Sequence, residues 1–336
     1  MTPQVSPSLR SLASEAGLSP MTISLALRNH PRISEATRNR VRQLAKLRGY
    51  TPDPQISTLM HHLRTRRQKR LQAVIAALTT MTRQQTNQYS QNIANSARER
   101  AIELGFGFDP IELTPHLSRP GILKRVLRNR GIEGIILLPM KEPIALDHLV
   151  DWRAMSVVGT SHSVLSPRFH SVLPDGFSST LLMCNQLNKL GFRRIGLILS
   201  VEMEERSRHN ITSAMLWHNT YAAVEPVHPL ISHSGNARRF ADWLKQEHPD
   251  AIISEARNVD AFFDWMGIAI GKKRPVFNYA AISLSCGDKA AGILQREKEV
   301  GRTAVELLAG MLQHGEKGIP KHPKLTLIPG SWKKAD

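Results

Sequence analysis

Cysteine is scarce in this sequence: Cys184 and Cys286 are the only two in 336 residues, and they lie about a hundred positions apart. This spacing excludes a disulfide framework and a paired-cysteine zinc site, so two reduced, packed thiols are the simplest interpretation. The chain also lacks any stretch of the ~18 apolar residues that a membrane span needs. Residues 1–17 contain no apolar run of the secretory-signal type. We therefore expect a cytoplasmic protein with no membrane partner.

Sequence signatures of catalysis are missing as well. The chain contains no Gly-x-Ser-x-Gly elbow, no Gly-x-x-x-x-Gly-Lys-Ser/Thr loop and no His-Glu-x-x-His metal site. Two histidine pairs, His162 with His170 and His228 with His233, lie in loop-like sequence, and metal binding there is the weaker interpretation. We expect neither enzymatic activity nor a cofactor nor a bound metal.

Negative charge is scarce in the first seventy residues, which hold 13 Lys and Arg against 3 Asp and Glu. This segment carries +10 of the formal charge of +17, and the remaining 266 residues carry +7. A short basic module on a more nearly neutral body is typical of a protein that binds a polyanion. Nucleic acid is favoured over a membrane surface because no basic amphipathic anchor accompanies the module.

The first fifty residues predict three short helices separated by tight turns. Ser19 is a good N-cap for the second helix and Ser34 for the third, while Gly17 and Gly49 end the first and the third. Two helices joined by so short a turn form a helix-turn-helix.

Residues 51–70 combine prolines, an apolar stripe at helical spacing and a basic tail, with nothing local to bury the stripe. They are either a linker or a helix that forms on a partner. From residue 71 the pattern changes to apolar strands alternating with amphipathic helices. The predicted strands are residues 71–78, 132–139, 154–159, 193–200, 250–254 and 274–280. Such runs are expected in buried parallel sheets, and this length accommodates two doubly wound α/β subdomains.

Two segments of the chain are similar to the LacI/GalR family of bacterial transcriptional repressors. The first is LASEAGLSPMTISLALRNHPRISEATRNRVRQLAKLRGYTPDP, residues 12–54, and the second is SVLPDGFSSTLLMCNQLNKLGFRRIGLIL, residues 171–199, with Phe192 where the family usually has His. The resemblance implies an α/β chain with an N-terminal all-α three-helix helix-turn-helix domain and a hinge helix. Two doubly wound parallel-sheet subdomains of periplasmic-binding-protein-like type follow.

The resemblance also implies domain limits. Residues 1–50 are expected to form the DNA-binding domain, residues 51–70 the hinge and residues 71–336 the core. Within the core we expect an N-subdomain of about 71–190 and 296–323, and a C-subdomain of about 191–295 and 324–336.

In this family a homodimer binds a pseudo-palindromic DNA operator, with its second helices in successive major grooves and its hinge helices in the minor groove. The chain would then act in the bacterial cytoplasm, at the nucleoid. Carried over onto this sequence, the DNA-binding residues are Ser8, Leu9, Ser19, Pro20, Met21, Thr22, Ser24, Leu25, Arg28, Asn29, Arg32, Ser34, Thr37, Ile56 and Leu59. Short hydroxyl side chains at helix N-termini suit phosphate contacts, and Leu59 with Ile56 would wedge a central base step.

Helical spacing separates two faces of the second helix without help from the family. Ile23, Ala26 and Leu27 share a stripe toward the other helices, which leaves Met21, Leu25 and Arg28 outward at i, i+4 and i+7. We expect the two apolar side chains to touch thymine methyl groups and the arginine to grip guanine. The alternatives are that Leu25 packs under a neighbouring helix and that Arg28 is phosphate-bound or solvated.

In members of this family a small effector, often a sugar or purine, binds between the two core subdomains. It shifts the dimer between a state that binds DNA well and a state that binds DNA weakly. The matching effector-binding positions are Asp175 and Arg208. The alternatives are a helix cap for Asp175 and an ion pair for Arg208. Where many members of the family have an Asn-Asp pair, this chain has EARN, residues 255–258. Where they have Gly-Phe/Tyr-Asp-Asp, it has NYAA, residues 278–281. Two carboxylates that would accept hydrogen bonds from sugar hydroxyl groups are therefore missing.

Three functions follow from these residues. The first is a DNA-binding repressor under small-molecule control, and the second is a DNA-binding regulator that is constitutive or controlled by a protein. The third is a solute-binding protein, which shares the two-subdomain core but is disfavoured by the basic N-terminal helices.

Overall fold

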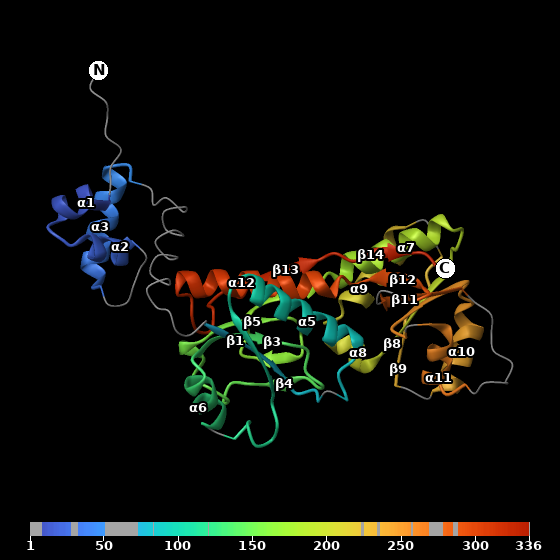
Figure 1. Ribbon diagram of the computed structural model, residues 1–336. Helices are drawn as coiled ribbons and strands as arrows, with labels where there is room; N and C mark the ends of the chain where they lie inside the picture. The colour runs from blue at the N-terminus through green and yellow to red at the C-terminus, as the bar shows by residue number, and fades with distance from the viewer. Residues whose placement is uncertain are drawn as a thin grey trace. The chain divides into compact units, whose positions relative to one another are not determined.

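The computed structural model describes residues 9–27, 33–50, 73–82, 84–119, 121–222, 225–233, 236–256, 258–268, 278–284 and 288–335 (Figure 1). The chain divides into two units, Met1–Leu71 and Gln72–Asp336. In the part of the chain that the structure describes, no helix is long and apolar enough to cross a membrane.

The first unit contains the three predicted helices, α1 (Leu9–Ala16), α2 (Pro20–Leu27) and α3 (Glu35–Leu47). Gly17, directly after α1, has φ +66°, a left-handed conformation that favours glycine and lets the chain turn at once into α2. Apolar side chains from all three helices form one buried cluster, namely Leu12, Ala13, Ala16, Ile23, Ala26, Val41 and Ala45. The prediction of a helix-turn-helix domain is confirmed.

The second unit begins with a six-stranded parallel sheet of order β13-β7-β5-β3-β1-β2. Its strands are β1 (Val74–Thr79), β2 (Gly107–Glu112), β3 (Ile132–Leu137), β5 (Ser156–Gly159), β7 (His170–Pro174) and β13 (Leu325–Ile328). Helices α5 (Gln88–Glu103) and α12 (Glu297–His314) cover one face, and α6 (Ile122–Asn129) covers the other. A two-stranded sheet, β4 (Ile144–Ala145) with β6 (Val164–Ser166), and a short 3-10 turn, Trp152–Ala154, lie among its connections.

Helices α5 and α12 run side by side (Figure 1). Gly301 allows this close approach, because a Cβ atom there would lie 2.2 Å from Ser96 Oγ and 2.4 Å from the carbonyl oxygen of Ile93. At the helix ends, Arg302 donates two hydrogen bonds to the Glu103 carboxylate at 2.9 and 2.8 Å. These contacts join segments about two hundred residues apart and close one face of the first sheet.

A second six-stranded sheet has the order β14-β12-β11-β10-β8-β9, parallel except for β14. Its strands are β8 (Ile195–Ser200), β9 (Leu230–Ser232), β10 (Ala251–Ser254), β11 (Asn278–Leu284), β12 (Ala291–Leu294) and β14 (Ser331–Lys333). Helices α7 (Gly176–Lys189) and α9 (Asn210–Tyr221) cover one face, and α10 (Ala237–Glu247) and α11 (Val259–Trp265) cover the other. A short helix, α8 (Val201–Arg206), follows β8. The expected pair of doubly wound sheets is confirmed.

The subdomain limits expected near residues 190 and 323 are wrong. Helix α7 packs on the second sheet through Met183, Cys184 and Leu187, so the first crossing follows β7 rather than α7. Strand β13 joins the first sheet by pairing with β7, so the last crossing follows β13. The amphipathic pattern of a helix shows that it covers a sheet, but both sheets offer the same kind of apolar face, so the pattern does not show which one.

Candidate DNA-binding and effector sites

Helix α2 combines a buried face with an exposed apolar face. Ile23 and Ala26 are fully buried, whereas Met21 is 64% exposed and Leu25 is half-buried. Within the described residues, Leu25 is not a member of the apolar cluster of this unit, although Leu27 packs against it. Apolar side chains in contact with water are less favourable than the same side chains buried against another surface, so this pair is suited to contact with a partner. Met21 therefore lies outward, as expected, and Leu25 is partly accessible at the side of the helix.

The N-termini of α2 and α3 carry the same arrangement of hydroxyl groups. Ser19 Oγ accepts from the backbone N–H of Thr22 at 3.1 Å and lies 2.9 Å from Thr22 Oγ1. Ser34 Oγ accepts from Thr37 N–H at 3.3 Å and lies 2.8 Å from Thr37 Oγ1. Each pair caps its helix and keeps a hydroxyl donor at the positive end of the helix dipole, which suits a phosphate oxygen.

The remaining DNA-binding predictions fall in two groups. Leu9 is half-buried against the apolar cluster, and Ser24 is half-buried in α2. Pro20 begins α2 in the position where a missing N–H costs nothing. The predictions for Ser8, Arg28, Asn29, Arg32, Ile56 and Leu59, and for the hinge at 51–70, lie outside the described residues.

In the core, Asp175 caps a helix. Its Oδ1 accepts from the backbone N–H of Ser178 at 2.9 Å at the start of α7, and its own N–H donates to the carbonyl of Ile328 at 2.9 Å. The residue therefore sits where the chain first crosses between the two sheets and where β13 ends. It does not line the pocket in which Arg208 lies.

Arg208 lines a pocket of about 170 Å³ together with residues of the first sheet and its loops. The polar side chains of the lining are Ser161, His162, Arg168, Ser171 and Arg208. Arg208 comes from the segment between α8 and α9 in the second half of the core, so the pocket lies between the two halves.

An unusual backbone conformation positions Arg208. Arg208 and His209 have φ values of 50° and 61°, the left-handed region that costs non-glycine residues about 1–3 kcal/mol each. Hydrogen bonds hold this turn: the N–H of Arg208 donates to Glu205 O at 3.0 Å, and His209 Nδ1 lies 2.8 Å from Glu204 Oε1. Nearby, Arg206 donates to the carbonyl of Lys141 and ties α8 to the loop after β3.

The basic groups in the pocket perturb one another. Burial, with the charges of Arg208 and then Arg168, lowers the pKa of His162 from 6.5 to about 4. Burial and the charge of Arg168 also lower the pKa of Arg208. His162 and Arg168 were not predicted as effector residues, because loop residues forty positions before Arg208 carry no spacing signal that links them to it.

Two histidines of the predicted pairs, His170 and His228, have structural partners. His170 is buried between Lys324 N–H and Glu316, at 2.9 Å from each, and His228 Nδ1 lies 3.0 Å from Glu247 Oε1. Among the described residues, no group of three or more His, Cys, Asp or Glu side chains is placed to hold a metal ion.

Polar side chains that follow the strands of the second sheet are already used. Glu255 Oε1 accepts from the backbone N–H of Ser200, and burial raises the pKa of this carboxyl group. Asn258 caps α11 by accepting from Ala261 N–H at 2.8 Å. Ala280 and Ala281 are fully buried in β11. This half of the core therefore offers few acceptors to a polyhydroxyl ligand.

Comparison of the sequence with known protein families gives a match over the helix-turn-helix unit. Residues 8–53 match the family described as "Bacterial regulatory proteins, lacI family". The helix-turn-helix unit of this chain is therefore similar to the DNA-binding domain of that family. The chain is 25% identical over 252 residues to the HTH-type transcriptional regulator TreR of Salmonella typhimurium, an alignment that covers 73% of this chain and 71% of that protein.

Solved structures of transcriptional regulators share the fold. A complex of the transcriptional regulator CelR with cellobiose has a TM-score of 0.55 and 17% identity, covering 98% of this chain and 99% of the other. A lac repressor dimer bound to operator and the anti-inducer ONPF has a TM-score of 0.54 and 17% identity, covering 98% of both chains. The chain therefore has the fold of these proteins over nearly its whole length.

Proposed function

We propose that this chain is a LacI-family repressor that binds a pseudo-palindromic operator as a homodimer, with α2 in the major groove. The observation that carries the proposal is the apolar side of α2 formed by exposed Met21 and half-buried Leu25, which lie outside the cluster that buries Ile23 and Ala26. Such a face suits the C5-methyl groups of thymine, and hydroxyl-capped helix ends on either side suit phosphates. Such a repressor works in the bacterial cytoplasm, at the nucleoid.

A dimer carries two copies of α2. Each copy would enter the major groove of one half-site, and the two half-sites would lie about one turn of the DNA helix apart. The similar lac repressor structure is a dimer bound to operator, which supports this arrangement. Ser19, Thr22, Ser34 and Thr37 would hold the backbone of each half-site, and the predicted wedge of Leu59 and Ile56 would act at the centre.

We further propose that a small molecule in the core controls DNA binding. The support is the pocket between the two halves of the core, to which Arg208 contributes its guanidinium. Regulators of the same fold have been solved with cellobiose and with glucose. Asp175 would act indirectly, by fixing the crossing between the sheets as the cap of α7.

Selection of bound DNA from a random pool, with the full chain, tests the DNA-binding function. We expect an inverted repeat whose half-sites favour A·T pairs opposite Met21 and Leu25. A single unrepeated half-site would contradict the dimer, and recovery of no preferred sequence would contradict a specific operator.

The second candidate is a regulator without a small-molecule effector. The lack of carboxylates at Ala280 and Ala281 favours it, since these positions offer a sugar no acceptors. A thermal-shift screen of sugars, nucleobases and phosphorylated metabolites separates the two, because a ligand at 100 times its dissociation constant stabilises by about 2.7 kcal/mol. No stabilisation by any class would favour the second candidate.

A further inference from the structure

The pocket between the two halves of the core has a lining of one charge sign. Its charged side chains are Arg168 and Arg208, the neutral imidazole of His162 lies with them, and no Asp or Glu side chain of the described residues lines it. Neither guanidinium makes an ion pair with a described carboxylate. By contrast, Arg48, Arg130, Arg153 and Arg194 are each paired with an acid.

We propose that this pocket binds the phosphate or carboxylate group of a small metabolite, gripped by Arg168 and Arg208. The inference rests on the proposed effector control and specifies its chemistry. Guanidinium groups bind planar and tetrahedral oxyanions with two parallel hydrogen bonds, which fixes the orientation of the ligand.

The hydroxyl groups of the lining argue against a neutral sugar. Ser161 Oγ lies 2.6 Å from Ser163 Oγ, and Ser171 Oγ donates to the carbonyl of Phe169 at 3.2 Å. The Ser171 donor is thus in use, and what the lining offers a ligand is chiefly the donors of the two arginines. Its side-chain acceptors are neutral hydroxyls and an imidazole, with no carboxylate of the kind that matches the hydroxyl donors of a polyol.

The size of the pocket points the same way. Its volume of about 170 Å³ is below the range of roughly 300–1,000 Å³ of pockets that enclose a drug-sized ligand. A pocket of this size suits a small charged group.

His162 supplies a signature of anion binding. Burial and the two arginines hold its pKa near 4, and an anion between the arginines would offset their charge. Binding should therefore raise the pKa of His162 and take up a proton at pH 5, whereas a neutral ligand should not. Calorimetry in two buffers of different ionisation enthalpy measures this uptake.

The direct test uses the full chain and three anions, inorganic phosphate, glucose 6-phosphate and citrate, at constant ionic strength, with glucose as the uncharged match. We compare R168Q and R208Q with R193Q, a control in which an exposed arginine outside the pocket loses the same charge. Circular dichroism checks that each variant folds. We expect at least one anion to bind, and R168Q and R208Q to weaken it roughly tenfold or more while R193Q does not.

The choice of anion defines the ligand. Binding of inorganic phosphate alone indicates a site for a free anion. Tighter binding of glucose 6-phosphate indicates a phosphorylated metabolite, and tighter binding of citrate indicates a carboxylate ligand. Each of these three results supports the proposal. Glucose binding as tightly as glucose 6-phosphate overturns it but keeps effector control. Binding of no anion, or equal affinity in R168Q, R208Q and R193Q, also overturns it. Selection of operator DNA is measured separately, so a failure here is distinguishable from a failure of the DNA-binding function.

Discussion

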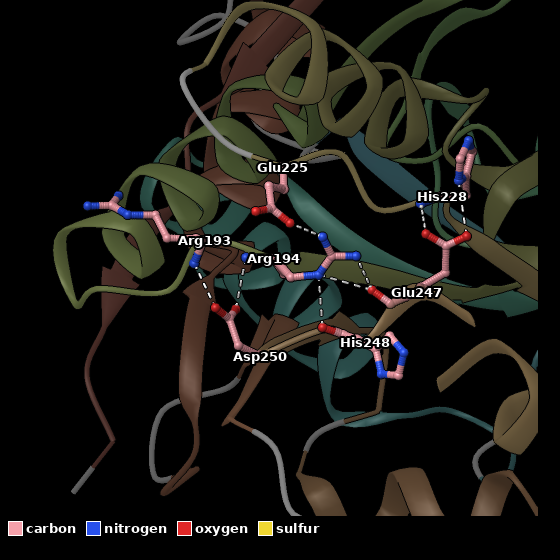
Figure 2. Close-up of polar contacts among 7 residues, drawn as sticks. All are labelled: Arg193, Arg194, Glu225, His228, Glu247, His248 and Asp250. Atoms are coloured by element: carbon pink, nitrogen blue, oxygen red, sulfur yellow. Dashed lines mark hydrogen bonds and ion pairs between the residues drawn. The ribbon is translucent and has the colours of Figure 1, made fainter. Parts of the chain in front are cut away.

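Arg194 Nε donates to the carbonyl oxygen of His248 at 3.0 Å, and its guanidinium also donates to the carbonyl of Glu247 (Figure 2). These carbonyls end α10, where His248 has φ 44°. Asp250 then accepts from the backbone N–H groups of Arg193 and Arg194 at 2.8 and 3.1 Å. A cation on the last carbonyls of α10 stabilises the negative end of the helix and fixes it to the start of β8.

We predict that R194Q lowers the free energy of unfolding by about 1–3 kcal/mol, because hydrogen bonds from a charged donor to these carbonyls are lost. Urea titration followed by circular dichroism measures the change. R193Q is the matched control, since the side chain of Arg193 makes no contact drawn in Figure 2 and its backbone bond to Asp250 does not depend on the side chain. Equal effects of the two substitutions would contradict the role of the guanidinium.

His170 anchors the last strand of the first sheet. Its Nδ1 accepts from Lys324 N–H and its Nε2 lies 2.9 Å from Glu316. Replacing it with alanine should lower the free energy of unfolding by about 2 kcal/mol or more, since a backbone N–H beside β13 loses its partner. H322A, an exposed histidine in the same segment, should change it by less than about 0.5 kcal/mol.

The apolar face of α2 should determine operator preference. We predict that the double variant M21A/L25A loses about tenfold in the ratio of operator to non-specific affinity, with an unchanged salt dependence because no phosphate contact is removed. L47A removes an apolar side chain that is 82% exposed on α3 and should leave the ratio unchanged. If M21A/L25A weakens both kinds of DNA equally, these side chains do not contact bases.

His162 should make the core acid-sensitive. Its pKa is about 4 in the folded chain against 6.5 ordinarily, so the unfolded chain binds a proton between these values and the folded chain does not. Stability contributed by the neutral imidazole is therefore lost as pH falls from 6.5 to 4. A shift of this size is worth up to ~3 kcal/mol, reduced to roughly 1–2 kcal/mol because the side chain is partly exposed and screened.

Urea denaturation at pH 7 and pH 4.5 measures this loss. H162N should lose less stability than the unchanged chain over this interval, and H148N, at an exposed histidine, should lose as much as the unchanged chain. An identical loss for H162N would show that other groups dominate acid unfolding.

Local signals made the first unit predictable. Ser19 and Ser34 cap their helices through hydrogen bonds three residues away, and Gly17 permits the left-handed turn between α1 and α2. The exposure of Met21 followed from helical spacing alone, because Ile23 and Ala26 occupy the opposite face. The predictions for Arg28 and Leu59 stay predictions.

In the core, the sequence predicted the buried central strands β1, β3, β5, β8, β10 and β11, since parallel strands covered on both faces are continuous apolar runs. The short strands β4, β6, β7, β9, β12, β13 and β14 were not among the predicted ones. Strand β13 is exposed along most of its length, so its composition does not distinguish it from a loop, and only its pairing with β7 makes it a strand.

By itself the sequence determined the helix-turn-helix, the basic charge of the first seventy residues and the two-sheet class of the core, because capping, helical period and apolar runs act over a few residues. The tertiary structure alone decided that α7 belongs to the second sheet, that β13 belongs to the first, and that Arg168 and His162 meet Arg208 in one pocket. These relationships join segments far apart in the chain, and they depend on how apolar faces of equal character pack, which no local pattern encodes.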